Sequence, residues 1–132
     1  MTVCSDTAAP AEATAVNIYQ AIGGRAAVTA AVDGLYGRII ADPVLGRFFP
    51  QGVAAKHRAY VVTVLGEALG GPERYRGPDL VKVHRGLGIT DADFDRTAGL
   101  LAATLDSLGV PGDLAGQIVG IVAGLRPALV TA

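Results

Sequence analysis

The chain has 132 residues, about the length of one domain, and its 11 Lys and Arg nearly balance its 12 Asp and Glu. The formal charge of −1 argues against a nucleic-acid binder, which normally carries a basic surplus. Hydrophobic residues make up 51% and charged residues 17%, which is too apolar for a disordered chain. A single cysteine, Cys4, excludes an internal disulfide and a Cys-rich zinc site, and it is consistent with a cytoplasmic protein.

The mean hydropathy of +0.42 is high, so a membrane span has to be considered. A span needs roughly 20 consecutive apolar residues. The richest apolar stretch lies between Gln117 and Arg126 and is too short, and the N-terminus lacks the basic flank and apolar core of a signal peptide. The surplus apolar residues are therefore expected in a core, an apolar ligand pocket or a subunit contact, in a monomer or a weak dimer.

The first half of the chain predicts a tail followed by helices. Residues 1–16 are small, rich in Ala and Thr and without periodicity, which predicts a loose tail before one domain over 17–132. A short helix over 17–22 is ended by Gly23 and Gly24. The next helix, over 25–41, has apolar residues at helical spacing at Val32, Leu35, Tyr36, Ile39 and Ile40. Asp42 and Pro43 then predict the N-cap and first residue of a short turn that ends at 48–50.

The second half continues the helical pattern. We expect a helix over 53–69, a loop over 72–79 and a short helix over 80–85. Thr90 and Asp93 predict the start of a helix that Gly109 ends, and Pro111 starts a last helix that reaches Leu129. The β-branched residues 61–64 could form a strand by propensity, but the helical spacing around them favours a helix. The sequence therefore predicts an all-α domain.

Two histidines are the most informative side chains for chemistry. His57 lies on the apolar face of a predicted helix, and His84 lies on a short apolar helix before a Gly-rich loop. A histidine on an apolar face is often a core residue with satisfied hydrogen bonds. An imidazole can also bind a metal through one nitrogen while the other donates to a backbone carbonyl. One histidine holds a metal weakly unless a macrocycle supplies the other ligands, as haem does, and the apolar surplus suits an apolar slot for haem.

The order and spacing of several motifs resemble the group I truncated haemoglobins, short globins with a two-on-two helical sandwich around a haem. The resemblance runs from Asn17 to Val130, about nine-tenths of the chain. Its segments are Ile18-Tyr19-x-x-Ile22-Gly23-Gly24, Val32-Asp33-x-x-Tyr36-x-Arg38 with Ala41-Asp42-Pro43, Phe48-Phe49, Ala68-Leu69-Gly70-Gly71-Pro72-Glu73-x-Tyr75-x-Gly77, His84-x-Gly86-Leu87-Gly88-Ile89-Thr90-x-x-x-Phe94 and Leu108-Gly109-Val110-Pro111. Each segment is weak by itself, but together they are specific.

The resemblance implies a role for each matching residue around the iron. His84 matches the proximal histidine, the protein ligand of the iron of haem b. Tyr36 matches the distal tyrosine whose hydroxyl hydrogen-bonds dioxygen, and Phe49 matches the phenylalanine packed on the haem at the corner between helices. His57 falls at the distal gate position, one turn before Val61, which faces the iron.

Other matches lie at the wall and edge of the haem. Tyr60 falls on the haem edge near a propionate, and Lys82 or Arg85, beside the proximal histidine, is expected to pair with a propionate. Phe48 extends the apolar core beside the haem. The further apolar wall residues are Leu65, Phe94 and Val122.

The chain departs from the family at Val61, a position where glutamine often supplies a second donor to bound oxygen. Because valine cannot donate, the distal polar set is Tyr36 with His57 as the second donor. A hydrogen bond to partly charged bound oxygen contributes about 1.5–3 kcal/mol, so its loss would speed dissociation roughly 10- to 100-fold. His57 has three open positions: pointing inward, swung out to solvent, or bound to the iron. Two structural alternatives are a core role for Tyr36, with a backbone carbonyl as its partner, and a hydrophobic staple at Phe48 and Phe49.

The resemblance implies a haem protein that reversibly binds dioxygen, carbon monoxide and nitric oxide, with oxygen transport as one use. It also implies nitric oxide dioxygenation, a detoxifying reaction that needs an external reductase because the chain carries no flavin or nicotinamide domain. A weaker peroxidase, with His57 as the acid–base group, is a third activity. The alternative from another class is a six-coordinate redox or gas-sensing protein with His57 on the iron. A haem-free helical interaction module is the last alternative.

Overall fold

The computed structural model describes residues 17–131, and all regular secondary structure in that part of the chain is helical, as predicted. The predicted tail and Cys4 lie outside the described residues. Within 17–131, none of the helices has the length and apolar content needed to cross a membrane. The elements are α2 (Ile18–Ile22), α3 (Gly24–Ala41), η1 (Leu45–Phe48), α4 (Ala55–Ala68), α5 (Leu80–His84), α6 (Asp91–Ser107), α7 (Gly112–Ala123) and α8 (Arg126–Leu129).

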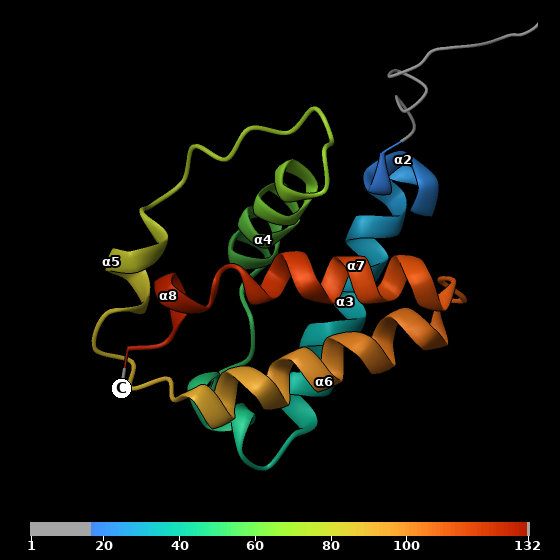
Figure 1. Cartoon of the computed structure of the whole chain (residues 1–132). Coiled ribbons are helices and arrows are strands. Elements are labelled where there is room, and N and C mark those ends of the chain that lie inside the picture. The colour runs from blue at the N-terminus through green and yellow to red at the C-terminus, as the bar shows by residue number, and fades with distance from the viewer. Residues whose placement is uncertain (1–16, 132) are drawn as a thin grey trace, which may run out of the picture.

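The long helices pack as two pairs, α3 with α4 and α6 with α7, and the pairs meet where α3 contacts α6. Figure 1 shows α6 and α7 side by side across α3, with α4 beside them and an extended loop leading from α4 to the short α5. α5 lies next to α8 at one end of the molecule, away from α2. This arrangement leaves the space between α4, α5 and α6 to be lined by side chains from both pairs.

The tightest packing lies where α3, α6 and α7 meet. The side chains with the lowest exposure there are Val28, Val32, Thr104, Leu105 and Ile118. Thr104 is buried, but its hydroxyl keeps a hydrogen bond, because it donates to the Leu100 carbonyl at 2.8 Å. At Gly34 an added Cβ would lie 2.8 Å from Thr104 Cγ2, so glycine permits the close approach of α3 and α6. These contacts anchor the helix that carries Tyr36.

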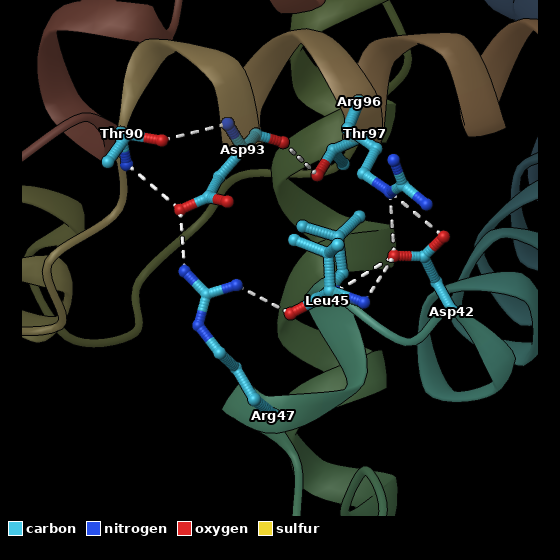
Figure 2. A network of polar contacts seen from close by, with 8 residues as sticks. Asp42, Leu45, Arg47, Thr90, Asp93, Arg96 and Thr97 are labelled. Carbon is cyan, nitrogen blue, oxygen red and sulfur yellow. Dashed lines mark hydrogen bonds and ion pairs between the residues drawn. The ribbon is translucent and has the colours of Figure 1, made fainter.

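The corner after α3 is held to α6 by two ion pairs (Figure 2). Asp42 accepts hydrogen bonds from the backbone N–H groups of Val44 and Leu45 and from Arg96 Nε, the last at 2.8 Å. The Arg96 hydrogen bond, with help from the Leu45 N–H, lowers the pKa of Asp42 to about 2. Arg47 donates to the buried carboxylate of Asp93 at 2.9 Å. The corner is therefore fixed to the start of α6.

Helix caps follow the sequence prediction at α6 and differ from it at the corner. The sequence predicts a helix start at residues 90–93, and the structure forms it as a capping box: the Thr90 hydroxyl accepts from the Asp93 N–H, and the Asp93 carboxylate accepts from the Thr90 N–H. At the corner, η1 begins at Leu45, so Pro43 is not the first helical residue. Asp42 caps the turn from further upstream instead. The predicted position of Pro43 is wrong because two residues separate the cap from the helix.

The last helix is interrupted, where the sequence predicts one helix to Leu129. α7 ends at Ala123, and α8 starts at Arg126. A continuous helix would need the N–H of Pro127 to donate to the carbonyl of Ala123, and proline has no N–H. The intervening turn tightens, with the Leu125 N–H donating to the Val122 carbonyl at 2.9 Å. Ile40 also differs from expectation, since 39% of it is exposed although it shares the predicted apolar stripe.

Candidate functional site

A cavity of about 730 Å³ opens between α3, α4, α5, α6 and α8. This volume suits a small molecule or cofactor, because the pockets that bind such ligands typically measure ~300–1,000 Å³. Most of its lining is apolar. The predicted site residues that line it are Tyr36, Phe48, Phe49, His57, Tyr60, Val61, Leu65, His84, Phe94 and Val122. Lys82 and Arg85 are exposed and do not belong to this lining.

His84 reaches the cavity from the C-terminal end of α5. The N-cap of that helix is Asp79, whose side chain accepts from the N–H of Val81 at 2.8 Å and of Lys82 at 3.1 Å. His84 Nδ1 lies 2.7 Å from the Leu80 carbonyl oxygen. Because a carbonyl oxygen only accepts, Nδ1 carries the hydrogen, and a neutral His84 therefore keeps a free lone pair on Nε2. This is the tautomer that a metal ligand needs.

Tyr36 and His57 meet inside the cavity from two different helices. Tyr36 Oη, on α3, lies 3.0 Å from His57 Nε2, on α4. The three rings of Tyr36, His57 and Phe49 pack edge to face, with centroids 5.3–5.7 Å apart. The partner of the Tyr36 hydroxyl is thus an imidazole and not a backbone carbonyl. Val61, one turn on from His57, lines the same cavity and cannot donate a hydrogen bond.

Burial keeps both members of this pair neutral. Desolvation raises the pKa of Tyr36 to about 12, and the positive charge of Arg58 opposes that rise. Burial, followed by repulsion from a positive His84, holds the pKa of His57 below its ordinary value. At neutral pH the tyrosine therefore keeps its proton and the histidine is uncharged. A neutral donor and a neutral imidazole lie next to each other in an apolar cavity.

A second group of side chains at the cavity consists of Lys56, Tyr60 and Tyr75, and the sequence did not reveal that these three lie together. Lys56 Nζ lies 5.7 Å from the ring centroid of Tyr60, and the Tyr60 and Tyr75 rings pack edge to face at 5.8 Å. The Tyr75 hydroxyl donates to the Pro78 carbonyl at 2.6 Å, which ties the loop before α5 to this group. All three side chains line the cavity. The only available signal was the position of Lys56 one turn before Tyr60, a spacing typical of any solvated helix face.

The donor set tests whether a metal could be held by this chain alone. Among residues 17–131, no group of three or more His, Cys, Asp or Glu side chains is arranged to hold a metal ion. The cavity offers one imidazole with the right tautomer, a facing polar pair and apolar walls. These features fit a flat macrocycle that brings its own ligands for a metal. Fold and site together define a helical protein with an apolar cavity that fits such a group.

Comparison with known proteins identifies the family. Residues 17–130 match the model of the bacterial-like globins. The group 1 truncated haemoglobin GlbN of Mycolicibacterium paratuberculosis is 37% identical over 115 residues, which cover 87% of this chain and 85% of that relative. GlbN of Synechocystis is 35% identical over 108 residues, 79% of this chain and 87% of that protein.

Solved structures agree with the sequence relatives. The Fe(III) form of the truncated haemoglobin of Tetrahymena pyriformis superposes with a TM-score of 0.82 at 28% identity, covering 88% of this chain and 99% of that one. The 2/2 haemoglobin of Synechococcus, described in the cyanomet state with covalently attached haem, gives 0.75 at 34% identity, covering 83% and 93%. The chain belongs to the bacterial-like globins, and within them to the group 1 truncated haemoglobins. The predicted two-on-two globin fold is confirmed, and membership in the family implies haem-based gas binding.

Proposed function

We propose that this chain binds haem b through His84 and reversibly binds dioxygen, carbon monoxide and nitric oxide on the side of Tyr36. The observation that carries the proposal is the placement of the Tyr36–His57 pair and of His84 in the lining of one apolar cavity. When bound, haem supplies an iron that takes up diatomic gases and that can give up one electron as dioxygen and nitric oxide form nitrate. We also propose a cytoplasmic location, with which the single cysteine is consistent.

The residues of the chain divide the work between the two sides of the cavity. His84 offers its Nε2 lone pair, because Nδ1–H is engaged by the Leu80 carbonyl. Tyr36 offers a hydroxyl that stays protonated, since its pKa is raised to about 12. The apolar walls exclude water, which strengthens any hydrogen bond from that hydroxyl to a polarised gas ligand. In this role His57 Nε2–H donates to Tyr36 Oη and holds the hydroxyl in place, which leaves the Tyr36 hydrogen free for the ligand; His57 acts as the second donor when that contact opens.

The propionates of haem need cations or hydroxyls at the edge of the cavity. We propose Lys56 and Tyr60 for this role, because Lys56 lies above the Tyr60 ring and both line the cavity. Lys82 and Arg85, exposed on and next to α5, are the second candidates. Charge at the edge and apolar contact inside match the two chemical ends of the haem group.

Nitric oxide dioxygenation is the reaction we propose for the same site. The polar pair next to an apolar space supports it, because a hydrogen bond from Tyr36 favours the charge that dioxygen gains on reduction. Each turnover leaves ferric iron, so an external reductase must return one electron. Weak peroxidase activity with His57 as the acid–base group is an additional activity of this arrangement.

The competing function is a six-coordinate redox or sensing protein in which His57 binds the iron. His57 and His84 both line the cavity, which keeps this alternative in view. The 3.0 Å contact of His57 Nε2 with Tyr36 Oη favours the open arrangement, because the nitrogen is already engaged by the hydroxyl. The coordination number of the ferrous protein separates the two functions.

The test is the absorption spectrum of the haem-reconstituted protein in its ferric and ferrous states, then with carbon monoxide and with oxygen. A five-coordinate ferrous spectrum that shifts with either gas supports the proposed function. A six-coordinate, low-spin ferrous spectrum that becomes five-coordinate in His57→Leu supports the redox or sensing function instead.

A variant pair assigns the proximal ligand. His84→Gly should lose the native spectrum and regain it with added imidazole, whereas His57→Leu should retain stoichiometric haem. Imidazole rescue separates ligation by His84 from a purely structural role. Absence of haem uptake by the wild-type chain would overturn the proposal and favour the haem-free interaction module.

A further inference from the structure

The helix that carries His84 is poorly embedded in the fold. α5 has five residues, and none of them is buried. Val81 and Val83 are each 45% exposed. The helix that packs most closely against α5 is α8 (Figure 1). The orientation of His84 therefore depends on how firmly α8 itself is held.

α8 is a single turn, and its first residue is an arginine that reaches α6. Arg126 donates to Asp91 Oδ1 at 2.8 Å from Nη1 and to Asp95 Oδ1 at 2.5 Å from Nη2. Its guanidinium carbon lies 4.5 Å from the centroid of the Phe94 ring. Two carboxylates and one aromatic face thus fix a single guanidinium. Exposed ion pairs contribute little singly, but a guanidinium held on three sides has little freedom left.

These contacts connect the surface with the lining of the cavity. Phe94, under the guanidinium, is 5% exposed and lines the cavity, as do Leu125, the residue before α8, and Leu129, the last residue of α8. Beyond α8 the Thr131 N–H donates to the Ile89 carbonyl at 2.9 Å, in the segment that follows α5. The C-terminal turn is therefore tied to α6 by its first residue and to the chain after His84 by its end.

We propose that Arg126 is a positioning residue for His84, acting through α8 to set the orientation and the retention of the proximal imidazole. The proposal rests on the proposed function, because it assumes that His84 holds haem iron. Loss of the guanidinium frees α8 from Asp91 and Asp95, and α5 then moves with it. His84 samples more orientations, its bond to iron weakens, and haem leaves faster.

The experiment compares Arg126→Met with Arg96→Met in the haem-loaded protein. The control removes a comparable ion pair: Arg96, a residue of α6, also makes two hydrogen bonds to carboxylate oxygens, and it ties α6 to Asp42 at the corner after α3. The readouts are the iron–histidine stretching band of the ferrous protein by resonance Raman spectroscopy and the rate of haem transfer to an apoglobin acceptor. We expect Arg126→Met to shift or broaden the band and to speed haem loss about threefold to tenfold, the effect of about 1 kcal/mol. Arg96→Met should leave the band unchanged.

A second variant keeps the test decisive if Arg126→Met folds poorly. Asp91→Asn with Asp95→Asn retains the guanidinium over Phe94 and removes only its charged partners, and it should reproduce part of the band change and of the faster haem loss. An unchanged band with unchanged haem loss in both variants would overturn the positioning role. Equal changes in Arg126→Met and Arg96→Met would also overturn it, because they would reflect general destabilisation. If the wild-type chain takes up no haem, the proposed function fails, whereas normal wild-type spectra with unaffected variants refute only the role of Arg126.

Discussion

At the scale of single residues, the proposed distal chemistry depends on a tyrosine and a histidine that burial keeps uncharged. A phenol exposed to water shares its hydrogen bonds with solvent, but Tyr36 is 9% exposed and has His57 as its partner. A hydroxyl held in this way is preorganised, because little reorganisation is needed when a polar ligand arrives. Val61 adds only methyl groups to the lining of the same cavity. We therefore expect the affinity for gas ligands to depend on two side chains from two helices.

We expect Tyr36→Phe to speed dioxygen dissociation about 10- to 100-fold, because one hydrogen bond to a partly charged ligand contributes about 1.5–3 kcal/mol. Carbon monoxide, which is less polarised, should dissociate at a rate much closer to that of the wild type. Stopped-flow displacement of each gas measures both rates. Tyr19→Phe is the matched control, since the Tyr19 hydroxyl donates to Glu73 and is not part of the cavity lining. An unchanged oxygen rate in Tyr36→Phe would reduce Tyr36 to a core residue.

The inward position of His57 can be tested through its pKa. Burial is the larger cause of the lowered pKa and persists once His84 is bound to iron, so we expect a folded-state value below the ordinary 6.5. Because protonation then favours the unfolded chain, the contribution of neutral His57 to stability is present above about pH 6.5 and lost as the pH falls below it. A proton NMR titration of the carbon monoxide complex measures the pKa directly. A value at or above 6.5 would place the imidazole in solvent.

At the scale of elements, we expect replacing a glycine by alanine to have opposite effects on stability in a loop and in a helix. An added Cβ on Gly71, after α4, would lie 2.5 Å from the Tyr19 ring and from Glu73 Oε1, whereas at Gly116 in α7 it would meet nothing within 4 Å. We expect Gly71→Ala to lower the free energy of unfolding by about 1–3 kcal/mol through overpacking. Gly116→Ala should raise it by about 0.5–1 kcal/mol, because alanine favours the helix. Urea unfolding of the two variants measures both, and a stabilising Gly71→Ala would contradict the close packing of the loop on α2.

The elements also show what sequence reasoning can reach. Residues 90–93 predict the start of α6 because an N-terminal cap signal is a local pattern, and Gly109 marks its end for the same reason. The break after α7 escaped prediction, since Leu125 and Leu129 continue the apolar spacing and hide the effect of Pro127. Asp42 and Arg96 are 54 residues apart in the chain, so their ion pair leaves no local pattern in the sequence.

The site residues also divide into those that the sequence reveals and those that only the packing of helices brings together. His84 stands out from the sequence because the chain has two histidines and this one precedes a Gly-rich loop. The approach of Tyr36 to His57 requires the packing of α3 on α4, which only the family resemblance anticipated. Lys56 was missed because the sequence alone does not show that a lysine on a helix lies over an aromatic ring.

At the scale of the whole molecule, stability is unevenly distributed. The side chains with the lowest exposure lie where α3, α6 and α7 meet, whereas α5 has none that is buried. Regions with few buried apolar contacts open locally at low cost in free energy. The half of the cavity that carries the proposed iron ligand thus has few buried side chains, and a ligand that touches both halves should stabilise this half most.

Hydrogen exchange should reveal this coupling as a difference between the haem-free and the haem-loaded protein. Haem bound in this cavity would contact His84 of α5 together with lining residues of α3, α4 and α6, so its binding free energy would oppose every opening that breaks those contacts. We expect amides of residues 80–89 to exchange at least tenfold more slowly with haem, while amides around Val28 and Leu105 change much less. Mass spectrometry of pulse-labelled protein measures both regions at once. Equal protection of the two regions without haem would show that α5 is held by the protein alone, and His84→Gly should abolish the difference if ligation is its cause.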